Sequence, residues 1–444
     1  MKQVYVETYG CQMNAADSDL VSGILKESGY SLVGAPEEAD AILINTCAVR
    51  EHAEDRVFGR IGEMAQYKHA RPDVIIGVLG CMAQHLKDKL LQKSRFVDIV
   101  AGPDSYRNIH NLLQQAATER VMDVRLDHQE IYEGILPARR EGISTYLTVQ
   151  RGCDKVCTFC VVPAVRGRER CVPLADVVEQ AKVMASSGIR EITLLGQTVN
   201  SYHDGTHDFA DLLTEVARIP DIVRIRHTSP YPTDFTDKLI ETMAREPKVA
   251  KHMHLPLQSA SNEVLGLMKR RYSIEQFDDI LGKVRSAMPG VAVSTDIIVG
   301  FHSETNEQFQ ETFDFIKRAR FDFAFMFKYS KRSNTAAYRW EEEISEETKT
   351  DRLKSIITLQ EGISREIQSG CVGRTVQVLV EGISKRMNGQ LFGKTSEFRQ
   401  VAFQPVGSAE PGDIVSVRIE QATGHTLIGS MLGSPTGKLV GTAI

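Results

Sequence analysis

Residues 146–160, YLTVQRGCDKVCTFC, join a strand-like alternating run to three closely spaced cysteines. Cys153, Cys157 and Cys160, here called the barrel triple, place three thiols within reach of one metal centre directly after a strand. A structural zinc ion needs a fourth nearby ligand, and the next cysteine, Cys171, lies beyond a proline and a basic stretch. An iron–sulfur cube with one open iron needs only three thiolates. The spacing favours iron–sulfur chemistry, with zinc or unliganded core cysteines as the alternatives.

Five more strand-like runs follow, and amphipathic helical stretches separate them. They cover residues 191–197, 223–229, 252–258, 291–301 and 321–330. Six such β/α units predict a partial barrel of parallel strands over residues 143–369. One helix start is marked in detail, because Ser273 and Gln276 form a capping box just before an apolar helical face.

Ahead of the barrel, residues 1–125 have the pattern of a small parallel α/β domain. Its strand-like runs lie at residues 4–10, 39–46 and 73–80, and a helical face at residues 18–30 follows the first run. We therefore expect three or more parallel strands covered by helices.

Three cysteines lie at or just beyond the ends of these first strands: Cys11, Cys47 and Cys81, here called the N-terminal triple. Because the carboxyl ends of parallel strands share one edge of a sheet, thiols distant in sequence are expected to meet there. Gly10 and Gly80 would let a cluster approach the backbone. The alternative is three independent buried cysteines.

The rest of the chain completes the predicted fold class, α/β with a terminal β-barrel. Residues 126–142 carry mixed charge, a proline and two glycines, and read as a linker. Residues 370–435 consist of short alternating runs broken by glycines, which predicts a small antiparallel β-barrel. Cys371 at its start is expected to pack.

The composition of the chain limits which kinds of binding partner can be expected. The chain has 444 residues, of which 42 % are hydrophobic and 25 % charged, with a net charge of −5. The hydrophobic and charged fractions exclude a disordered chain. Because the net charge is negative, any binding of nucleic acid would depend on local basic surface. No apolar stretch reaches about 18 residues, and the opening MKQVYVETYG lacks the features of a secretory signal. We therefore expect a cytoplasmic protein without a membrane partner, and we expect a monomer.

Two basic stretches fall where the barrel mouth is expected. They consist of Arg151, Lys155, Arg166, Arg168 and Arg170 around the barrel triple, and of Lys328, Lys331, Arg332 and Arg339 after the last strand. Both predict a positive path for RNA, although charge runs are often only solvated surface.

The barrel triple after the first strand of a six-unit barrel resembles the radical S-adenosylmethionine (SAM) superfamily. Two three-cysteine sites followed by a small β-barrel resemble its methylthiotransferases, which carry an α/β cluster domain, a radical SAM barrel and a TRAM domain in this order. The motifs are GCQMN, NTCAVRE, GCMAQ, RGCDKVCTFC, RGRE, LLGQTVNSY, HLPLQS and STDIIVGF. Together they resemble the branch that acts on tRNA more than the alternative branch, which acts on a ribosomal protein.

This resemblance implies two 4Fe-4S clusters and SAM as cofactors. In the family, the barrel triple holds the radical-generating cluster and the N-terminal triple holds an auxiliary cluster that carries the transferred sulfur. One SAM methylates the sulfur, and a second yields the radical that activates carbon 2 of N6-dimethylallyladenosine at position 37 of tRNA, next to the anticodon. The implied partners are the anticodon stem-loop with that base and an electron donor such as flavodoxin or ferredoxin.

The resemblance also suggests residues that contact SAM or the base. Phe159 matches the family's aromatic position beside the adenine. The polar candidates at the strand ends of the barrel are Gln197, Asn200, His254, Gln258 and Glu304. Each of the six could instead be a packed or hydrogen-bonded structural residue. A zinc-bearing RNA-binding protein, whose cysteines only brace the fold, is the non-catalytic alternative.

Overall fold

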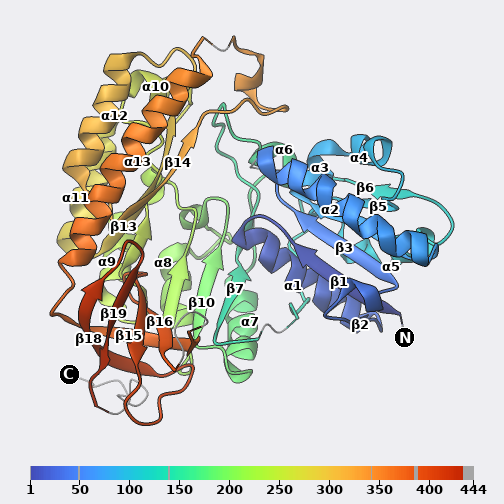
Figure 1. Ribbon diagram of the computed structural model, residues 1–444, viewed down its shortest axis with the longest axis horizontal. Helices are drawn as coiled ribbons and strands as arrows, with labels where there is room; N and C mark the ends of the chain where they lie inside the picture. The colour runs from blue at the N-terminus through green and yellow to red at the C-terminus, as the bar shows by residue number, and fades with distance from the viewer. Residues whose placement is uncertain (1, 49–50, 139–140, 342, 385–388, 434–444) are drawn as a thin grey trace.

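The fold consists of three units in chain order: an α/β domain, an open barrel and a small closed barrel (Figure 1). The computed structural model describes residues 2–48, 51–138, 141–341, 343–384 and 389–433. Residues 139–140 of the expected linker and 434–435 of the expected terminal domain lie outside these ranges. Within the described ranges, none of the helices combines the length and the apolar character that crossing a bilayer requires.

The first unit is a parallel sheet in the order β2-β1-β3-β4-β5-β6. Its strands are β1 (Gln3–Thr8), β2 (Ser31–Leu32), β3 (Ala41–Thr46), β4 (Ile75–Gly80), β5 (Ile99–Ala101) and β6 (Val121–Asp123). β3 and β4 are buried along their whole length, as continuous apolar runs between two helical layers should be. The three expected strands are confirmed, while β5 and β6, of three residues each, were not foreseen.

Helices cover both faces of this sheet. They are α1 (Gln12–Glu27), α2 (Glu51–Ala70), α3 (Cys81–Leu86), α4 (Asp88–Lys93) and α5 (Ile109–Gln115). Leu25 of α1 belongs to the apolar core on one face, and Val57 of α2 to the core on the other. The segment after β6 joins the first core, because Tyr132 is buried there and its hydroxyl donates to the Pro103 carbonyl at 2.7 Å.

The second unit holds six parallel β/α strands, as expected. They are β7 (Ser144–Thr148), β10 (Glu191–Leu195), β11 (Arg224–His227), β12 (His252–His254), β13 (Ala292–Val299) and β14 (Phe323–Lys328). They form two three-stranded sheets, β7-β10-β11 and β12-β13-β14, and a parallel bridge between Ile225 and Val249 joins the two. Among the described residues no pairing joins β14 to β7, so the barrel is open on that side.

The strands of the barrel alternate with helices that pack one large core outside it. The helices are α7 (Leu174–Ser186), α8 (Phe209–Ala217), α9 (Asp237–Arg245), α10 (Asn262–Leu267), α11 (Ile274–Ala287), α12 (Asn306–Ala319) and α13 (Glu346–Ser369). The expected capping box at α11 is confirmed, with Ser273 and Gln276 each accepting from the other's backbone N–H. A short hairpin of β8 (Gln150–Arg151) and β9 (Arg170–Cys171) encloses α6 (Val162–Arg166).

The third unit is a closed five-stranded barrel in the order β15-β16-β17-β19-β18. Its strands are β15 (Thr375–Ile383), β16 (Leu391–Thr395), β17 (Gln400–Gln404), β18 (Ile414–Ala422) and β19 (Thr426–Met431). The expected β-barrel is confirmed, except that the β17–β19 pair is parallel and the other four pairs are antiparallel. Cys371 is buried in its core.

The small barrel docks on the N-terminal ends of the radical-barrel strands. Arg226 of β11 donates to the Thr395 carbonyl at 2.7 Å and lies over the Phe398 ring at 4.9 Å. His252 of β12 stacks on Phe398 with ring centroids 5.1 Å apart. The two units therefore meet at the end of the barrel away from α6 (Figure 1).

Candidate functional site

The N-terminal triple comes together at the carboxyl edge of the first sheet. Cys11 is the N-cap of α1, Cys47 directly follows β3, and Cys81 begins α3 after β4. A hydrogen bond with Cys47 lowers the pKa of the Cys11 thiol to about 6, whereas complete burial raises the pKa of Cys81 to about 11. Cys11 is exposed and the other two are buried, so the site opens toward solvent at one corner.

Glycines and asparagines shape this edge. A Cβ on Gly10 would lie 2.4 Å from Cβ of Cys47. Gly80 has a backbone φ of +90°, which residues other than glycine rarely adopt. Asn14 Nδ2 donates to Asn45 Oδ1 and to the Thr46 carbonyl, both at 3.1 Å. Glycine thus lets the loops approach, and the two amides fix them in place.

The barrel triple occupies the loop between β8 and α6 (Val162–Arg166). Burial, together with the neighbouring charges of Cys157 and Cys153, raises the pKa of Cys160 to about 12. Arg270 Nη1 donates to Cys157 Sγ at 3.5 Å, and this arginine lies 4.4 Å from the Tyr231 ring centroid.

The segment after the barrel triple packs on the N-terminal triple across the domain boundary. Val161 and Val165, which follow the barrel triple, pack in one buried cluster with Cys81 and Ala48, the residue after Cys47. Figure 1 accordingly shows α6 beside α3. The loop that holds one triple is therefore the packing partner of the other.

Both triples have the donor chemistry of iron–sulfur sites. Each presents three sulfur donors from one short loop or one sheet edge, and thiolate sulfur is the usual ligand of iron–sulfur clusters. Within the described ranges no three His, Cys, Asp or Glu side chains converge as the ligands of one metal ion would. A four-iron cube spreads its thiolates over separate corners, so the residues present fit a cluster.

Two expected SAM or base contacts are engaged within the protein. Asn200 Nδ2 donates to the Tyr231 carbonyl at 2.9 Å, and its Oδ1 accepts from Tyr231 N at 2.7 Å, which ties the loops after β10 and β11 together. Glu304 pairs with Arg352 at 2.7 Å and accepts from Gly300 N at 2.6 Å. Burial raises the pKa of Glu304, and its Oε1 has no hydrogen-bond partner in the part of the chain that the structure describes.

The other four expected contacts lie in or near the barrel. Phe159 is half-buried, with its ring 6.3 Å from Phe301. His254 contacts Ser294 Oγ at 3.0 Å and Asp296 at 3.2 Å. Among the described residues Gln197 Oε1 is buried without a partner, which leaves an acceptor for a bound molecule. Gln258 is buried beside β13, with φ of +66°.

A buried ion network beside the triples was missed by the sequence reasoning. Asp17 of α1 accepts from Arg151 at 2.9 Å and from Arg166 at 2.7 Å, and Arg166 Nε donates to Cys81 Sγ at 3.1 Å. Burial opposes the charge of Asp17, but the two arginines outweigh it and lower its pKa. A lone acid on the apolar face of the α1 sequence was the available signal.

The expectation of a basic RNA path around the barrel triple is therefore wrong for three of its five residues. Arg151 and Arg166 pair with Asp17, and Arg170 pairs with Asp104 at 2.8 Å; each of these arginine side chains is only 4 % exposed. They pair with acids that lie far away in the sequence, which a local charge count does not detect.

Three families match this chain in succession. The uncharacterized protein family UPF0004 matches residues 3–102, the Radical SAM superfamily residues 147–316 and the TRAM domain residues 370–432. A solved radical S-adenosylmethionine methyltransferase from Kitasatospora setae, TsrM, with cobalamin and a [4Fe-4S] cluster bound, has a TM-score of 0.58 at 13 % identity over 88 % of this chain and 77 % of that one. The fold and the cysteines define a radical SAM protein, and this superfamily implies a 4Fe-4S cluster and SAM.

Relatives of similar length define the particular family. The tRNA-2-methylthio-N(6)-dimethylallyladenosine synthase of Chloroherpeton thalassium is 42 % identical over 97 % of this chain and 96 % of its own. The synthase of the same name from Porphyromonas gingivalis is 41 % identical over 98 % and 96 %. The chain belongs to the family of tRNA-2-methylthio-N(6)-dimethylallyladenosine synthases.

Proposed function

We propose that this chain is a radical SAM methylthiotransferase that converts N6-dimethylallyladenosine at position 37 of tRNA to its 2-methylthio derivative. The observation that carries the proposal is the packing of Val161 and Val165, next to the barrel triple, on Cys81 of the N-terminal triple. A sulfur-bearing site and a radical-generating site must lie close together if both act on one base. Resemblance to synthases over nearly the whole chain supports the same reaction.

The two triples divide the work in this proposal. Cys153, Cys157 and Cys160 would hold the 4Fe-4S cluster that binds SAM, and the N-terminal triple would hold the auxiliary 4Fe-4S cluster that carries sulfur. When bound, the first cluster supplies the electron that breaks the sulfonium bond of SAM, which gives a radical able to take hydrogen from a carbon that no side-chain base deprotonates. The protein's own part is to hold the thiols, orient the base and exclude water.

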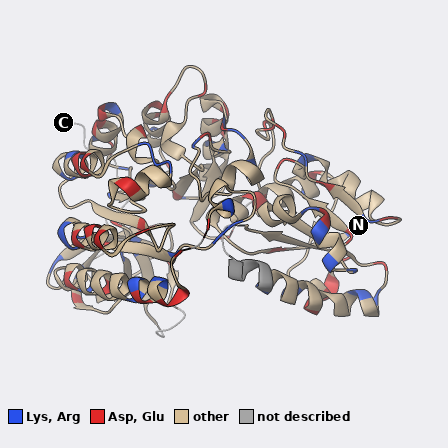
Figure 2. Ribbon diagram, turned by 90° about the horizontal axis from the view of Figure 1, so that it is seen from above, with Lys and Arg blue, Asp and Glu red and all other residues tan. Residues whose placement is uncertain are grey.

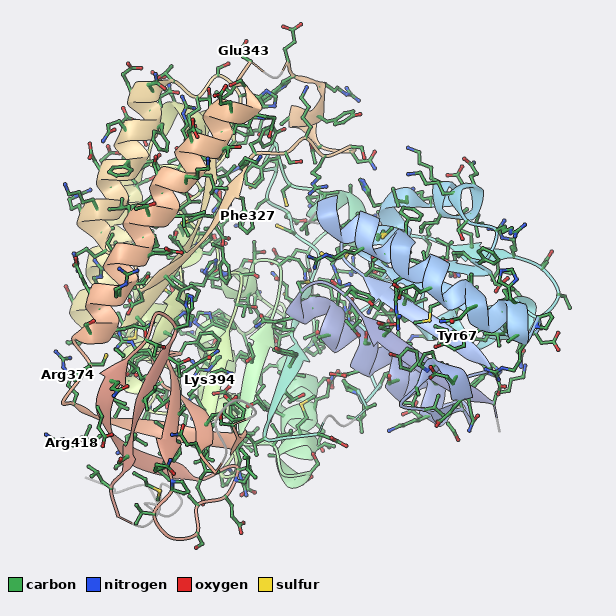
Figure 3. The ribbon with its side chains drawn as sticks, viewed as in Figure 1. Tyr67, Phe327, Glu343, Arg374, Lys394 and Arg418 are labelled. Carbon is green, nitrogen blue, oxygen red and sulfur yellow. The ribbon has the colours of Figure 1, made fainter. Side chains whose placement is uncertain are left out.

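The inner face of β14 is the proposed binding wall for the base. Ala324 and Met326 pack on the helices outside the barrel, so the alternating residues Phe323, Phe325 and Phe327 face its interior. Phe325 and Phe327 remain 46 % and 38 % exposed, which is unusual for inward-facing phenylalanines. Figure 3 labels Phe327 beside β14, on the side toward the N-terminal domain.

This wall leads to the barrel triple. Tyr329, which follows β14, contacts Phe301 at 4.8 Å between ring centroids, and Phe301 in turn contacts Phe159, the residue before Cys160. His254 lies 6.0 Å from the Phe325 ring and supplies a polar neighbour. An adenine with an apolar five-carbon substituent requires such a mixed surface, so we assign the dimethylallyl group to Phe325 and Phe327.

The anticodon stem would meet the remaining exposed basic residues. Arg374 and Arg418 are exposed on the TRAM barrel, and Arg339 lies beside the exposed Tyr338, which offers a ring for stacking. Figure 2 shows acidic and basic residues interspersed on the barrel helices, so these local groups rather than the overall field would attract RNA. A flavodoxin or ferredoxin as electron donor and a monomeric state complete the proposal.

The test separates the two triples. Anaerobically reconstituted protein is given SAM, a reductant and a prenylated anticodon stem-loop, and both 5′-deoxyadenosine and the methylthiolated nucleoside are measured. Cys47→Ala should keep SAM cleavage but lose the methylthiolated product, and Cys157→Ala should lose both. Cys171→Ser is the matched control and should keep both activities and the full iron content.

Two outcomes would contradict the proposal. Full product from Cys47→Ala would remove the sulfur-donating role of the N-terminal triple. Methylthiolation of a ribosomal protein, with none on the stem-loop, would overturn the assignment of substrate.

A further inference from the structure

A buried chain of charges links the two cysteine triples. Asp17, on α1 of the first domain, holds Arg151 and Arg166 of the barrel domain at 2.9 and 2.7 Å. Arg166 also reaches back across the boundary, because its Nε donates to Cys81 Sγ at 3.1 Å. Arg151 lies two residues before Cys153, so the chain begins at one triple and ends at the other.

The charges of this network do not balance. Two arginines face one carboxylate, which leaves 2 − 1 = +1, and the exposed fractions of the side chains are 4 %, 4 % and 0 %. An unbalanced buried charge costs several kcal/mol, so a site of this kind needs an anion. The neighbouring pair of Arg170 and Asp104 is equally buried but balanced.

One donor of the same guanidinium has no partner. Arg166 Nη2 donates a hydrogen bond to Asp17, and Arg166 Nε donates one to Cys81. The third nitrogen of this guanidinium, Nη1, is buried without a hydrogen bond among the described residues. Arg151 Nε also lacks a partner, but Arg151 lines a cavity of about 20 Å³, which has room for one water molecule. Buried arginine donors are rarely left unsatisfied, so Nη1 points to a missing acceptor.

We propose that Arg166 is a positioning residue for the auxiliary cluster, supplying it with a buried positive charge and N–H donors, while Asp17 fixes this arginine to Arg151 beside the barrel triple. The inference rests on the proposed function. Three thiolates around an iron–sulfur core carry net negative charge and offer sulfur acceptors. Such a cluster would therefore compensate the excess positive charge of the two arginines and accept a hydrogen bond from Arg166 Nη1.

The inference predicts how the cluster takes up an electron. A positive charge and hydrogen bonds to cluster sulfur stabilise the reduced, more negative form, so Arg166 should raise the midpoint potential of the auxiliary cluster. Asp17 should lower it, because its carboxylate partly cancels that charge. Substitutions at the two positions should therefore shift the potential in opposite directions.

The experiment isolates the auxiliary cluster. In full-length protein whose barrel triple is changed to alanine, the cluster is reconstituted anaerobically and its midpoint potential is measured by an EPR-monitored redox titration. Arg166→Gln should shift the potential to a more negative value and Asp17→Asn to a more positive value. Arg226→Gln, which disrupts an equally buried pair with Glu191 at the opposite end of the barrel, should leave the potential unchanged.

Each result decides the inference. Shifts of the same sign for Arg166→Gln and Asp17→Asn, or an equal shift for Arg226→Gln, would show a packing effect and overturn it. If Arg166→Gln does not fold, Arg166→Lys, which keeps the charge, should retain the cluster with a smaller negative shift, and an unchanged potential would count against the inference. A parent protein that binds no iron would overturn the proposed auxiliary cluster itself, and is recognised before any variant is compared.

Discussion

Replacing Gly80 with alanine should destabilise the edge that holds the N-terminal triple. Gly80 has φ of +90° and ψ of −157°, a region that costs an alanine about 1–3 kcal/mol. The added Cβ would also lie 2.3 Å from Asn45 Oδ1 and 2.7 Å from the Thr46 carbonyl, and such overpacking costs about 1–3 kcal/mol more. We expect a total loss of roughly 4 kcal/mol for this domain.

The same change should reach the cysteines. Relief of the clash moves Asn45, which Asn14 holds at 3.1 Å, and Cys11 Sγ donates to Asn14 Oδ1 at 3.1 Å. Gly80→Ala should therefore lower both the thermal unfolding midpoint and the iron bound per chain after reconstitution. The control is Gly62→Ala, in the middle of α2, where the added Cβ would meet no described residue outside the helix's own backbone within 4 Å. This change should stabilise the helix by about 0.5–1 kcal/mol. Unchanged melting and full iron content for Gly80→Ala would refute the reasoning.

Two further predictions concern the barrel interior. In competition assays, Phe327→Ala should reduce the preference for prenylated over unprenylated stem-loop about tenfold, or ~1.4 kcal/mol. The control is Phe392→Ala on the TRAM barrel, a similarly exposed phenylalanine at 36 %, which should leave the preference unchanged. An unchanged preference for Phe327→Ala would remove Phe327 from the base site. His227 is buried, and both of its ring nitrogens lack a hydrogen-bond partner among the described residues; burial, followed by the charge of His254, lowers its pKa from 6.5 to about 4. As the pH falls, the unfolded state takes up this proton before the folded state does. The contribution of neutral His227 to the free energy of unfolding should therefore be fully present above about pH 6.5 and decrease by roughly 3 kcal/mol toward pH 4. Thermal melts at about pH 7 and pH 5 should show that His227→Gln lacks this part of the pH dependence.

Most strands of the fold were predictable because each corresponds to a local pattern of apolar residues in the sequence. Continuous apolar runs such as residues 41–46 and 75–80 are buried on both faces, as is typical of strands in a parallel sheet between helices. The short β5 and β6 were not predictable, since a run of three residues carries no period. The parallel closure of β17 on β19 was also hidden, because strand order depends on contacts that no local pattern records.

The two cysteine triples were more predictable than the residues around them. Cysteine spacing and the shared edge of a parallel sheet suffice to group Cys11, Cys47 and Cys81. The ion pairs of Asp17 with Arg151 and Arg166 join residues more than 130 positions apart, so the arginines read as surface charge until the fold supplies their partner. Asn200 shows the same limit, because whether an amide is free or already bonded depends on the facing loop.

The docking of the TRAM barrel determines from which side a base can enter. Arg224 donates to the Lys394 carbonyl at 2.8 Å and Arg226 to those of Thr395 and Ser396, so the segment 394–399 covers the N-terminal end of the radical barrel. These arginines are buried and bonded to carbonyls, which removes them from any RNA-binding role. A radical must be kept from water, and an end sealed by protein serves that need. We therefore expect the base to approach from the opposite end or through the open side between β14 and β7, where the loop of the barrel triple packs on Cys81.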